Sequence, residues 1–359
     1  MEKIKLGNAC KFVEEKIPVS NLDKTNYIST ENLLPNKGGI TFANSLPPSE
    51  ITKKFCSDDV LISNIRPYFK KIFYPTFDGG CSNDVLVLRT NKNFYSKFLY
   101  YVLSEDNFFD FATKTAKGTK MPRGNKDALI NYPVPNFLFE HQEQIGNFLY
   151  LLDEKISINK KINATLEAMA KTIYMHKFFR KAANGKISDI IIENLKSTIP
   201  VGAAKSSCGE FPFFTSGEKI LRWNNFLVDG RNIFLNTGGN VGVNFYVGNA
   251  AYSTDTWCIT VKNFSDYLYL LLNSIQIEIE RKFFHGTGLK HLQKNSLRER
   301  AIYIPTADEL ENFNAVVQPC FDMISKNQRE NFKLEKLRDF LLPMLMNGQV
   351  RIENLNEEI

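Results

Sequence analysis

The sequence predicts an α+β protein made of two diverged copies of one unit, each with a mixed sheet, short helices and a long helix at its end. Three observations predict this: an internal repeat, two stretches of heptad-spaced apolar residues, and short β-branched or aromatic runs bounded by turn residues. The 359 residues are 43% hydrophobic and 23% charged. This composition excludes a wholly disordered chain and is sufficient for two hydrophobic cores.

The internal repeat is clearest between residues 114–174 and the segment 168 positions later. Matched residues include Lys114 with Lys282, Gly118-Thr119 with Gly286-Thr287, Leu129 with Leu297, Asn159 with Asn327 and Asn163 with Asn331. Upstream the offset drifts, so that Val60-Leu61-Ile62 corresponds to Ile233-Phe234-Leu235 and Ser82-Asn83-Asp84 to Ser253-Thr254-Asp255. We therefore predict two copies, roughly 1–184 and 185–359, and four segments: domains 1–139 and 185–306, a central helix 140–184, and a C-terminal helix with its tail, 307–359.

The first part of each copy has the pattern of a mixed domain. Strands are predicted at 59–63 and 82–88, joined through Gly79-Gly80, and at 232–237, 242–247 and 256–261, around Gly238-Gly239. Short helices are predicted near 95–112 and 265–283.

The last part of each copy predicts a long helix with a coiled-coil seam. The seam residues are Ile145, Leu152, Asn159, Leu166 and Ile173 in the first helix, and Phe313, Cys320, Asn327, Leu334 and Leu341 in the second. Asn159 and Asn327 share one heptad position, where a buried asparagine costs stability but specifies register. Each helix could pack on its own domain, but the matched seams favour helices that pair with each other. The short link 181–185 favours an antiparallel pair with pseudo-twofold symmetry.

The sequence also contains signals for the ends of these helices. Thr306 and Glu309 have the spacing of a capping box, and Asn136 is the predicted cap of the first long helix. Pro319 predicts that the second helix kinks or begins only after it.

The net charge of +6 permits a nucleic-acid partner without requiring one. The excess of basic residues lies in the two domains, whereas residues 307–359 contain six basic and ten acidic side chains. This negative balance disfavours DNA contact there. Any one basic loop could be only a solvated face. However, basic loops recur at equivalent places around Gly118-Thr119 and Gly286-Thr287, which favours a role in binding phosphates and base edges.

Signals for catalysis, metal binding and export are weak. The six cysteines and four histidines lack metal-ligand spacing, and the cysteines lack the spacing of a disulfide framework. Residues 237–242 are glycine-rich but lack the ending of a P-loop, which favours a hairpin turn. The N-terminus has no signal-peptide core and no apolar run is long enough to span a membrane, so we expect a cytoplasmic protein.

The order of several short motifs, together with the duplication, resembles the DNA-specificity (S) subunit of type I restriction-modification enzymes. The stretches that carry the resemblance are residues 27–34, 59–67, 81–86, 118–123 and 133–135, the last leading into Glu140-His141-Gln142-Glu143-Gln144-Ile145. The resemblance implies a non-catalytic subunit with two target-recognition domains that read a bipartite double-stranded DNA target, and paired helices as a spacer. It implies two methyltransferase (M) subunits and restriction (R) subunits as partners. It also implies that S-adenosylmethionine, ATP and Mg are bound by those partners, with no cofactor, metal or membrane bound by this chain.

Within that framework, we predict that four loops contact DNA: residues 64–71, 115–123, 236–244 and 286–291. The candidate DNA-binding residues are Asn64, Arg66, Lys70, Lys71, Lys117, Thr119, Lys120, Arg123, Asn236, Thr237, Asn240, Asn244, Thr287, Lys290 and His291. Arg66, Arg123, Asn240 and His291 are predicted to contact bases, and Lys70, Lys120 and Lys290 to contact phosphates. Residues 347–352 and the exposed helix faces are predicted to hold the M subunits. The alternatives are a DNA methyltransferase or nuclease with its own active site, and a protein-binding assembly scaffold.

Overall fold

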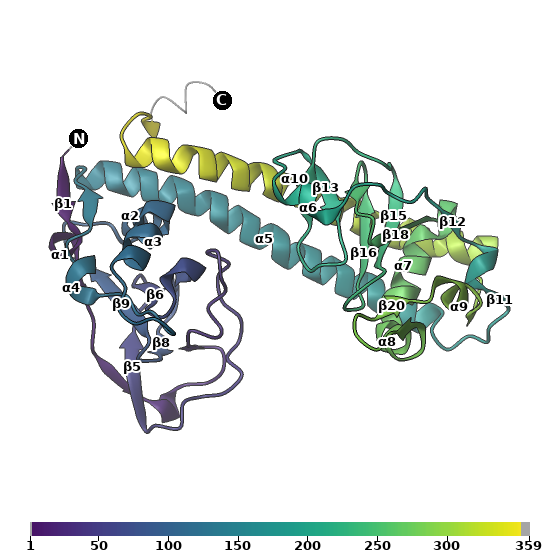
Figure 1. Cartoon of the computed structure of the whole chain (residues 1–359), viewed down its shortest axis with the longest axis horizontal. Helices are drawn as coiled ribbons and strands as arrows, with labels where there is room; N and C mark the ends of the chain where they lie inside the picture. Colours follow the sequence, from purple (N-terminus) through teal and green to yellow (C-terminus); the bar gives the residue numbers. More distant parts are fainter. Residues whose placement is uncertain (1, 353–359) are drawn as a thin grey trace. The chain divides into compact units, whose positions relative to one another are not determined.

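The computed structural model describes residues 2–352, so Met1 and residues 353–359, the end of the expected tail, lie outside the described residues. The chain forms two compact units. Unit 1 runs up to Ile156 and resumes at Lys333, and unit 2 is Ser157–Phe332. Each unit therefore contains one domain and one end of each of two long helices, α5 (Phe139–Lys177) and α10 (Ala307–Met346) (Figure 1).

The domain of unit 1 contains two four-stranded sheets and a short strand pair. The first sheet has the order β2 (Cys10–Phe12), β9 (Val85–Thr90), β6 (Val60–Ser63), β7 (Ile72–Phe73), and the second β3 (Lys16–Pro18), β5 (Ile51–Phe55), β8 (Gly79–Cys81), β4 (Tyr27–Ile28). The remaining elements are β1 (Lys3–Lys5), β10 (Pro133–Pro135), α1 (Leu6–Ala9), α2 (Ser96–Ser104), α3 (Asp106–Lys114), α4 (Lys126–Leu129), and the 3-10 turns η1 (Val19–Asn21) and η2 (Pro67–Phe69).

Alternation of side chains along β6 explains how this domain is layered. Val60 and Ile62 pack into the core shared with the helices, and Leu61 packs into the core between the two sheets. The strand is thus buried on both faces, which accounts for its continuous apolar sequence.

The domain of unit 2 repeats this plan, with three strands instead of four in its second sheet. Its main sheet has the order β12 (Ile192–Glu193), β18 (Thr256–Thr260), β15 (Arg231–Asn236), β16 (Val243–Val247), and its second sheet β14 (Leu221–Trp223), β13 (Phe211–Phe214), β17 (Ala251–Tyr252). The other elements are β11 (Gly185–Lys186), β19 (Phe284–His285), β20 (His291–Leu292), β21 (Ala301–Ile302), α6 (Val201–Lys205), α7 (Ser265–Ser274), α8 (Gln276–Phe283), α9 (Lys294–Arg298), η3 (Ile187–Asp189) and η4 (Lys262–Phe264).

The two domains are structural copies of each other. The order β2-β9-β6-β7 in unit 1 corresponds to β12-β18-β15-β16 in unit 2. In the second sheets, β4 pairs parallel with β8 and β13 pairs parallel with β17. The predicted internal repeat is therefore confirmed, including its drifting offset upstream of residue 114.

Within each unit the two long helices pair antiparallel, as predicted. In unit 1, Arg338 of α10 forms an ion pair with Asp153 of α5. In unit 2, Asn159 donates to the side chain of Asn331 over 2.8 Å, and Asn327 donates to that of Asn163 over the same distance. These two asparagine pairs exchange places under the pseudo-twofold symmetry of the repeat.

The predicted seam residues differ in how deeply they are buried. Ile145, Asn159, Phe313, Cys320, Asn327 and Leu341 are buried, whereas Leu152, Leu166, Ile173 and Leu334 are half-buried. The helices also pack on the domains, because Ile145 and Leu341 share the core of unit 1 while Phe313 and Ala170 share the core of unit 2. The structure thus combines the two packing arrangements that the sequence left open.

Four local predictions can be compared with the structure. The capping box is confirmed, since the backbone N–H of Thr306 donates to Glu309 and that of Glu309 donates to the Thr306 hydroxyl. Asn136 is not the cap of α5, because it lies three residues before Phe139, the first residue of the helix, and its side-chain amide donates to Glu2. The helix α10 begins at Ala307, so a start after Pro319 is wrong. Gly79-Gly80 is not a linker but part of β8, where a Cβ on Gly79 would lie 2.2 Å from the Asn26 carbonyl oxygen.

Candidate nucleic-acid interface

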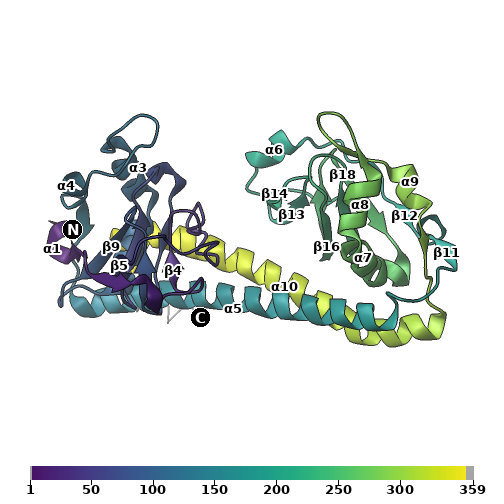
Figure 2. The ribbon, with the colours of Figure 1, turned by 90° about the horizontal axis from the view of Figure 1, so that it is seen from below.

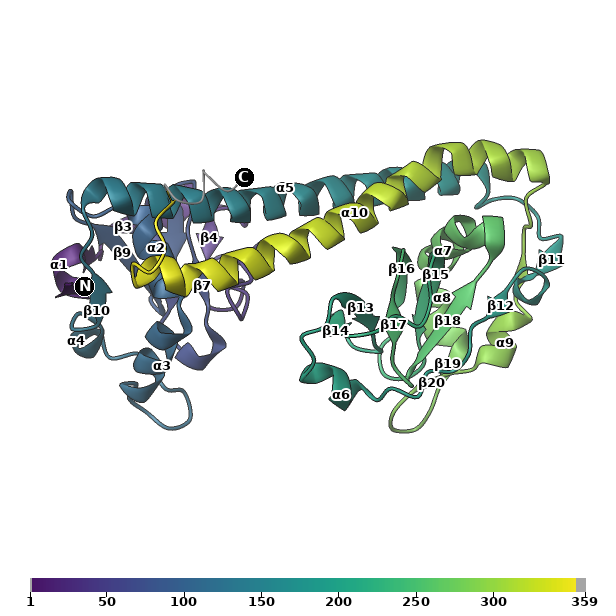
Figure 3. The same cartoon turned by 90° about the horizontal axis from the view of Figure 1, so that it is seen from above.

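In unit 1, the backbone joins two of the predicted DNA-contacting loops into one surface. The Arg66 N–H donates to the Pro122 carbonyl over 2.8 Å, and the Gly124 N–H donates to the Asn64 carbonyl over 3.0 Å. Lys117 and Arg123 exchange two backbone hydrogen bonds of 2.9 Å and so close a hairpin. In Figures 2 and 3 the loop between α3 and α4, which contains this hairpin, projects from unit 1 on the side away from α5 and α10.

In unit 2, the other two loops are joined in the same way. The Gly239 N–H donates to the Lys290 carbonyl over 3.1 Å, and the Leu292 N–H donates to the Thr237 carbonyl over 3.0 Å. His285 and His291 face each other in the strand pair β19–β20, which closes the second hairpin. The turn of this hairpin also lies on the side of unit 2 away from the long helices (Figure 3).

These contacts establish which residues of the two surfaces correspond. The backbone N–H of Asn64 donates to the Asp84 carbonyl, and that of Thr237 donates to the Asp255 carbonyl, so the two residues occupy equivalent positions. By the same pattern of bonds, Arg123 corresponds to His291. Gly118 and Gly286 have φ values of 94° and 155°, a backbone conformation that favours glycine. The Gly-Thr repeat in the sequence therefore marks the same hairpin turn in both units.

The hairpin of unit 1 carries the exposed cations of this surface. Lys117, Thr119 and Lys120 are exposed. The Arg123 side chain is 58% exposed and its guanidinium lies 3.0 Å from the carboxylate of Asp84. Arg123 is therefore accessible and already paired with a carboxylate. Asp84 was not among the candidates, although the repeat of Ser-Asn-Asp and Ser-Thr-Asp in the sequence marks its position.

Lys70 and Lys71 have partners within unit 1. Lys70 and Lys37 each lie 3.0 Å from the carboxylate of Asp106. Burial opposes ionisation of this carboxyl, but the two lysines together hold its pKa below the usual value. The ammonium of Lys71 donates to the Thr30 carbonyl over 2.5 Å, and burial lowers its pKa against the opposing effect of Glu31. These two cations thus connect the loop 64–71 to its own domain.

Arg66 lies at the point where the loop 64–71 turns. Its backbone is left-handed, with a φ of 51°, and its Nε is buried without a hydrogen-bond partner among the described residues. The Oδ1 of Asn64 is also buried without a hydrogen-bond partner among the described residues. Tyr68 and Phe69 follow with exposed rings 4.8 Å apart, so this loop presents aromatic surface beside the hairpin.

In unit 2, the Asn236 side chain is hydrogen-bonded to the backbone of the glycine-rich loop 237–242. This side chain is buried, and its amide donates to the carbonyls of Ser216 and Asn240 over 3.1 and 3.0 Å. The side chains of Asn240, Thr287, Lys290 and His291 are exposed, while Thr237 and Asn244 are half-buried. The residues 237–242 connect β15 to β16, as the predicted hairpin turn requires.

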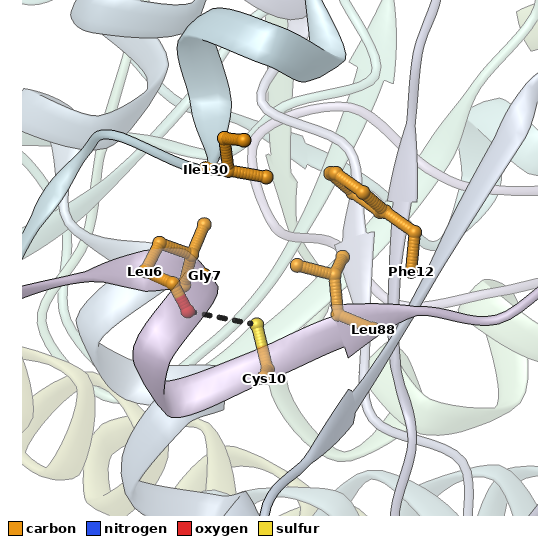
Figure 4. A pocket seen from close by; sticks show the side chains of 6 residues that line it. All are labelled: Leu6, Gly7, Cys10, Phe12, Leu88 and Ile130. Carbon is orange, nitrogen blue, oxygen red and sulfur yellow. Dashed lines mark hydrogen bonds between the residues drawn. The ribbon is translucent and has the colours of Figure 1, made fainter.

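Over residues 2–352, no group of three or more His, Cys, Asp or Glu side chains is placed to hold a metal ion. A small pocket in unit 1 is lined by Leu6, Gly7, Cys10, Phe12, Leu88 and Ile130 (Figure 4). The Cys10 thiol donates to the Leu6 carbonyl, and burial raises the pKa of Cys10 to about 12, so it is protonated at neutral pH. Within the same residues, no helix combines the length and apolarity that crossing a bilayer requires.

Comparison with known proteins agrees with this architecture. The family model described as the type I restriction modification DNA specificity domain matches residues 1–168 and again 181–333. The MjaIX specificity subunit of a type I restriction enzyme from Methanocaldococcus jannaschii is 25% identical over 312 residues, covering 72% of this chain and 70% of that protein. The MjaVIII specificity subunit from the same organism is 22% identical and covers 99% of this chain and 94% of that protein.

One solved structure shares the fold over nearly the whole chain. The S subunit of a type I restriction-modification system from M. genitalium aligns with a TM-score of 0.63 and 13% sequence identity, covering 96% of each chain. Two duplicated mixed domains, two paired helices and two hairpin surfaces with exposed donors define the architecture of a DNA-recognition protein. The chain belongs to the type I restriction-modification DNA specificity family, and its role is DNA specificity.

Proposed function

We propose that the chain reads a bipartite double-stranded DNA target, with each domain contacting one half-site. The observation that carries this proposal is the recurrence of one surface in both units: a loop joined by backbone hydrogen bonds to a glycine hairpin with exposed donors. Lysine and backbone N–H groups suit phosphates, and arginine, asparagine and histidine suit base edges. A surface built on rigid strands can hold these donors in the register that sequence readout requires.

We propose that the partners are two M subunits and R subunits, which would bind S-adenosylmethionine, ATP and Mg. Exposed apolar side chains along the long helices support a protein interface there. They are Leu151, Ile158, Ile162 and Met169 on α5, and Val316, Met323, Leu337 and Phe340 on α10. Val350 and Ile352 pack against the core of unit 1, so the segment 347–352 would present its remaining side chains from a fixed position.

The proposal assigns no catalytic step to this chain, and places it in the cytoplasm with the DNA it reads. The rival, a methyltransferase or nuclease with its own active site, predicts product from the purified chain alone. The test is to incubate the chain with DNA and either S-adenosylmethionine or Mg, with and without the M subunit. Methyl transfer by the chain alone would contradict the non-catalytic role.

The experiment that tests the DNA target is methylome sequencing of a host that expresses the chain with its M subunit. We expect a methylated motif with two specific parts separated by a fixed gap. Exchanging residues 1–139 for the first domain of another family member should change one part only. A scaffold that binds protein rather than DNA would give no new methylated motif. Its binding to random DNA would also lack the steep salt dependence that phosphate contacts cause.

A further inference from the structure

We propose that Met121 in unit 1 and Leu289 in unit 2 make apolar contacts with DNA bases, one in each half-site, an inference that rests on the function proposed above. Both side chains are large and apolar, yet they are 50% and 64% exposed. Neither belongs to a hydrophobic core cluster of the described residues. Each lies in the turn of a hairpin that projects from its domain (Figures 2 and 3).

The two residues occupy equivalent positions in the duplicated fold. Each follows the left-handed glycine of its hairpin by three residues, Gly118 in unit 1 and Gly286 in unit 2. A Cβ on Gly118 would lie 3.6 Å from the Met121 carbonyl oxygen, and one on Gly286 would lie 2.5 Å from the Leu289 carbonyl oxygen. The residues directly beside them differ between the copies, Lys120 and Pro122 in unit 1 against Gly288 and Lys290 in unit 2. The apolar side chain is therefore shared at this position where its immediate neighbours are not.

The charges around these side chains indicate which kind of ligand they contact. Met121 is flanked by Lys117, Lys120 and Arg123 on its own hairpin. Leu289 is followed directly by Lys290 and His291, both exposed. The apolar side chain thus lies among cations in unit 1 and beside the Lys290 cation in unit 2. A DNA duplex, a polyanion with an apolar interior, complements such a surface. In such a duplex, an aliphatic side chain can contact the thymine methyl group or enter between base pairs.

The test compares Met121→Ala and Leu289→Ala in the full chain with its M subunit. The probes are a duplex with the methylome-defined target and a duplex with the same bases scrambled. We expect each variant to bind the target duplex about 5- to 50-fold more weakly and the scrambled duplex as before. The salt dependence should not change, because an apolar side chain displaces no counterion. Met121→Leu should bind within twofold of the unmodified protein.

Leu195→Ala is the matched control, since Leu195 is 91% exposed in unit 2 but lies outside the hairpin. It should leave binding of both duplexes unchanged. Replacing each target thymine by deoxyuridine removes its methyl group, so a loss of affinity indicates a methyl contact. Placing 2-aminopurine at each base step tests for insertion between base pairs through its fluorescence. The proposal is supported if the effect of deoxyuridine or the 2-aminopurine response is present with the unmodified protein and lost with the alanine variant.

The proposal is overturned if both alanine variants bind the target duplex within twofold of the unmodified protein, or lose equal affinity for the scrambled duplex. Failure of the proposed function gives a different result, because the unmodified protein would then show no preference for the target duplex over the scrambled one.

Discussion

At the scale of single residues, the two candidate recognition surfaces share a backbone arrangement but differ in side chains. Arg123 in unit 1 is paired with Asp84, while His291 occupies the equivalent position in unit 2. Arginine offers a planar pair of donors that matches guanine, whereas histidine offers at most one donor toward a given base edge. Under the proposed function, one fold would therefore read two different half-sites through changes at corresponding positions.

The first prediction concerns the Arg123–Asp84 pair. Arg123→Ala should weaken binding of the target duplex by about 1–3 kcal/mol and relax one position of one half-site, because a base contact is lost. Asp84→Ala should instead raise affinity for scrambled DNA, because it removes a negative charge close to the phosphates. Binding isotherms on both duplexes measure the two effects. A uniform loss on both duplexes for Arg123→Ala would assign it to phosphate rather than to a base.

The second prediction ranks three lysines by the partners they already have. Lys120 and Lys290 are exposed, whereas Lys70 is paired with Asp106. Lys120→Ala and Lys290→Ala should each weaken binding to all sequences alike and lower the slope of log K against log salt by about 1. Lys70→Ala should lower it less, because its ammonium already has a carboxylate partner. If the three variants lowered the salt slope equally, the Lys70–Asp106 ion pair would have to open when DNA binds.

At the scale of elements, the sequence predicts the regular parts of the fold well and the connections between loops poorly. The strands β6, β9, β15, β16 and β18, and the helices near 95–112 and 265–283, lie close to where periodicity places them. The sequence does not predict the second sheet of each domain, because strands such as Tyr27–Ile28 are too short to show the alternation of apolar and polar residues. Glycine pairs favour turns, so the sequence predicts Gly79-Gly80 as a linker, but the ring of Phe55 fills the space that a side chain on Gly79 would need.

The candidate site shows the same limit. The sequence indicates all four loops, since basic residues and glycines mark them locally. It cannot show that Arg66 and Pro122 share a hydrogen bond, because that contact depends on how distant segments pack. Likewise, the seam predicts that Asn159 is buried, but only the structure shows that its partner is Asn331.

The third prediction concerns the ion pairs that join elements of unit 2. Arg231 of β15 contacts both Asp266 of α7, whose side chain is fully buried, and Asp322 of α10, whose side chain is 53% exposed. Asp266→Asn should destabilise unit 2 by about 3 kcal/mol, because it leaves a largely buried guanidinium without its main partner. Asp322→Asn, the matched control, should cost less than about 1 kcal/mol, because solvent already screens that pair.

Both tryptophans, Trp223 and Trp257, lie in unit 2, so their fluorescence follows unfolding of this unit. Denaturant titrations of the two variants and the unmodified protein provide the comparison. If the two substitutions shifted the transition equally, burial would not be what distinguishes the pairs.

At the scale of the whole molecule, the duplication supplies two candidate reading surfaces in one chain, and the long helices are the elements common to both units. Ile156 and Ser157 of α5, and Phe332 and Lys333 of α10, mark the boundary between the units. Both helices are continuous through this boundary. A change in helix length there leaves the residues of each unit intact.

The last prediction uses this boundary. Inserting seven helix-forming residues after Ile156 and seven after Phe332 keeps the heptad register and lengthens each helix by about 10 Å. This corresponds to about three base pairs at 3.4 Å each. We expect the gap of the methylated motif to grow by about that number while both half-sites stay the same, because no recognition loop has changed. An insertion in α5 alone is the control; it should abolish methylation, since it moves Asn159 and Asn163 out of register with Asn331 and Asn327. An unchanged gap in the double insertion, with methylation retained, would mean that the helices do not set the spacing.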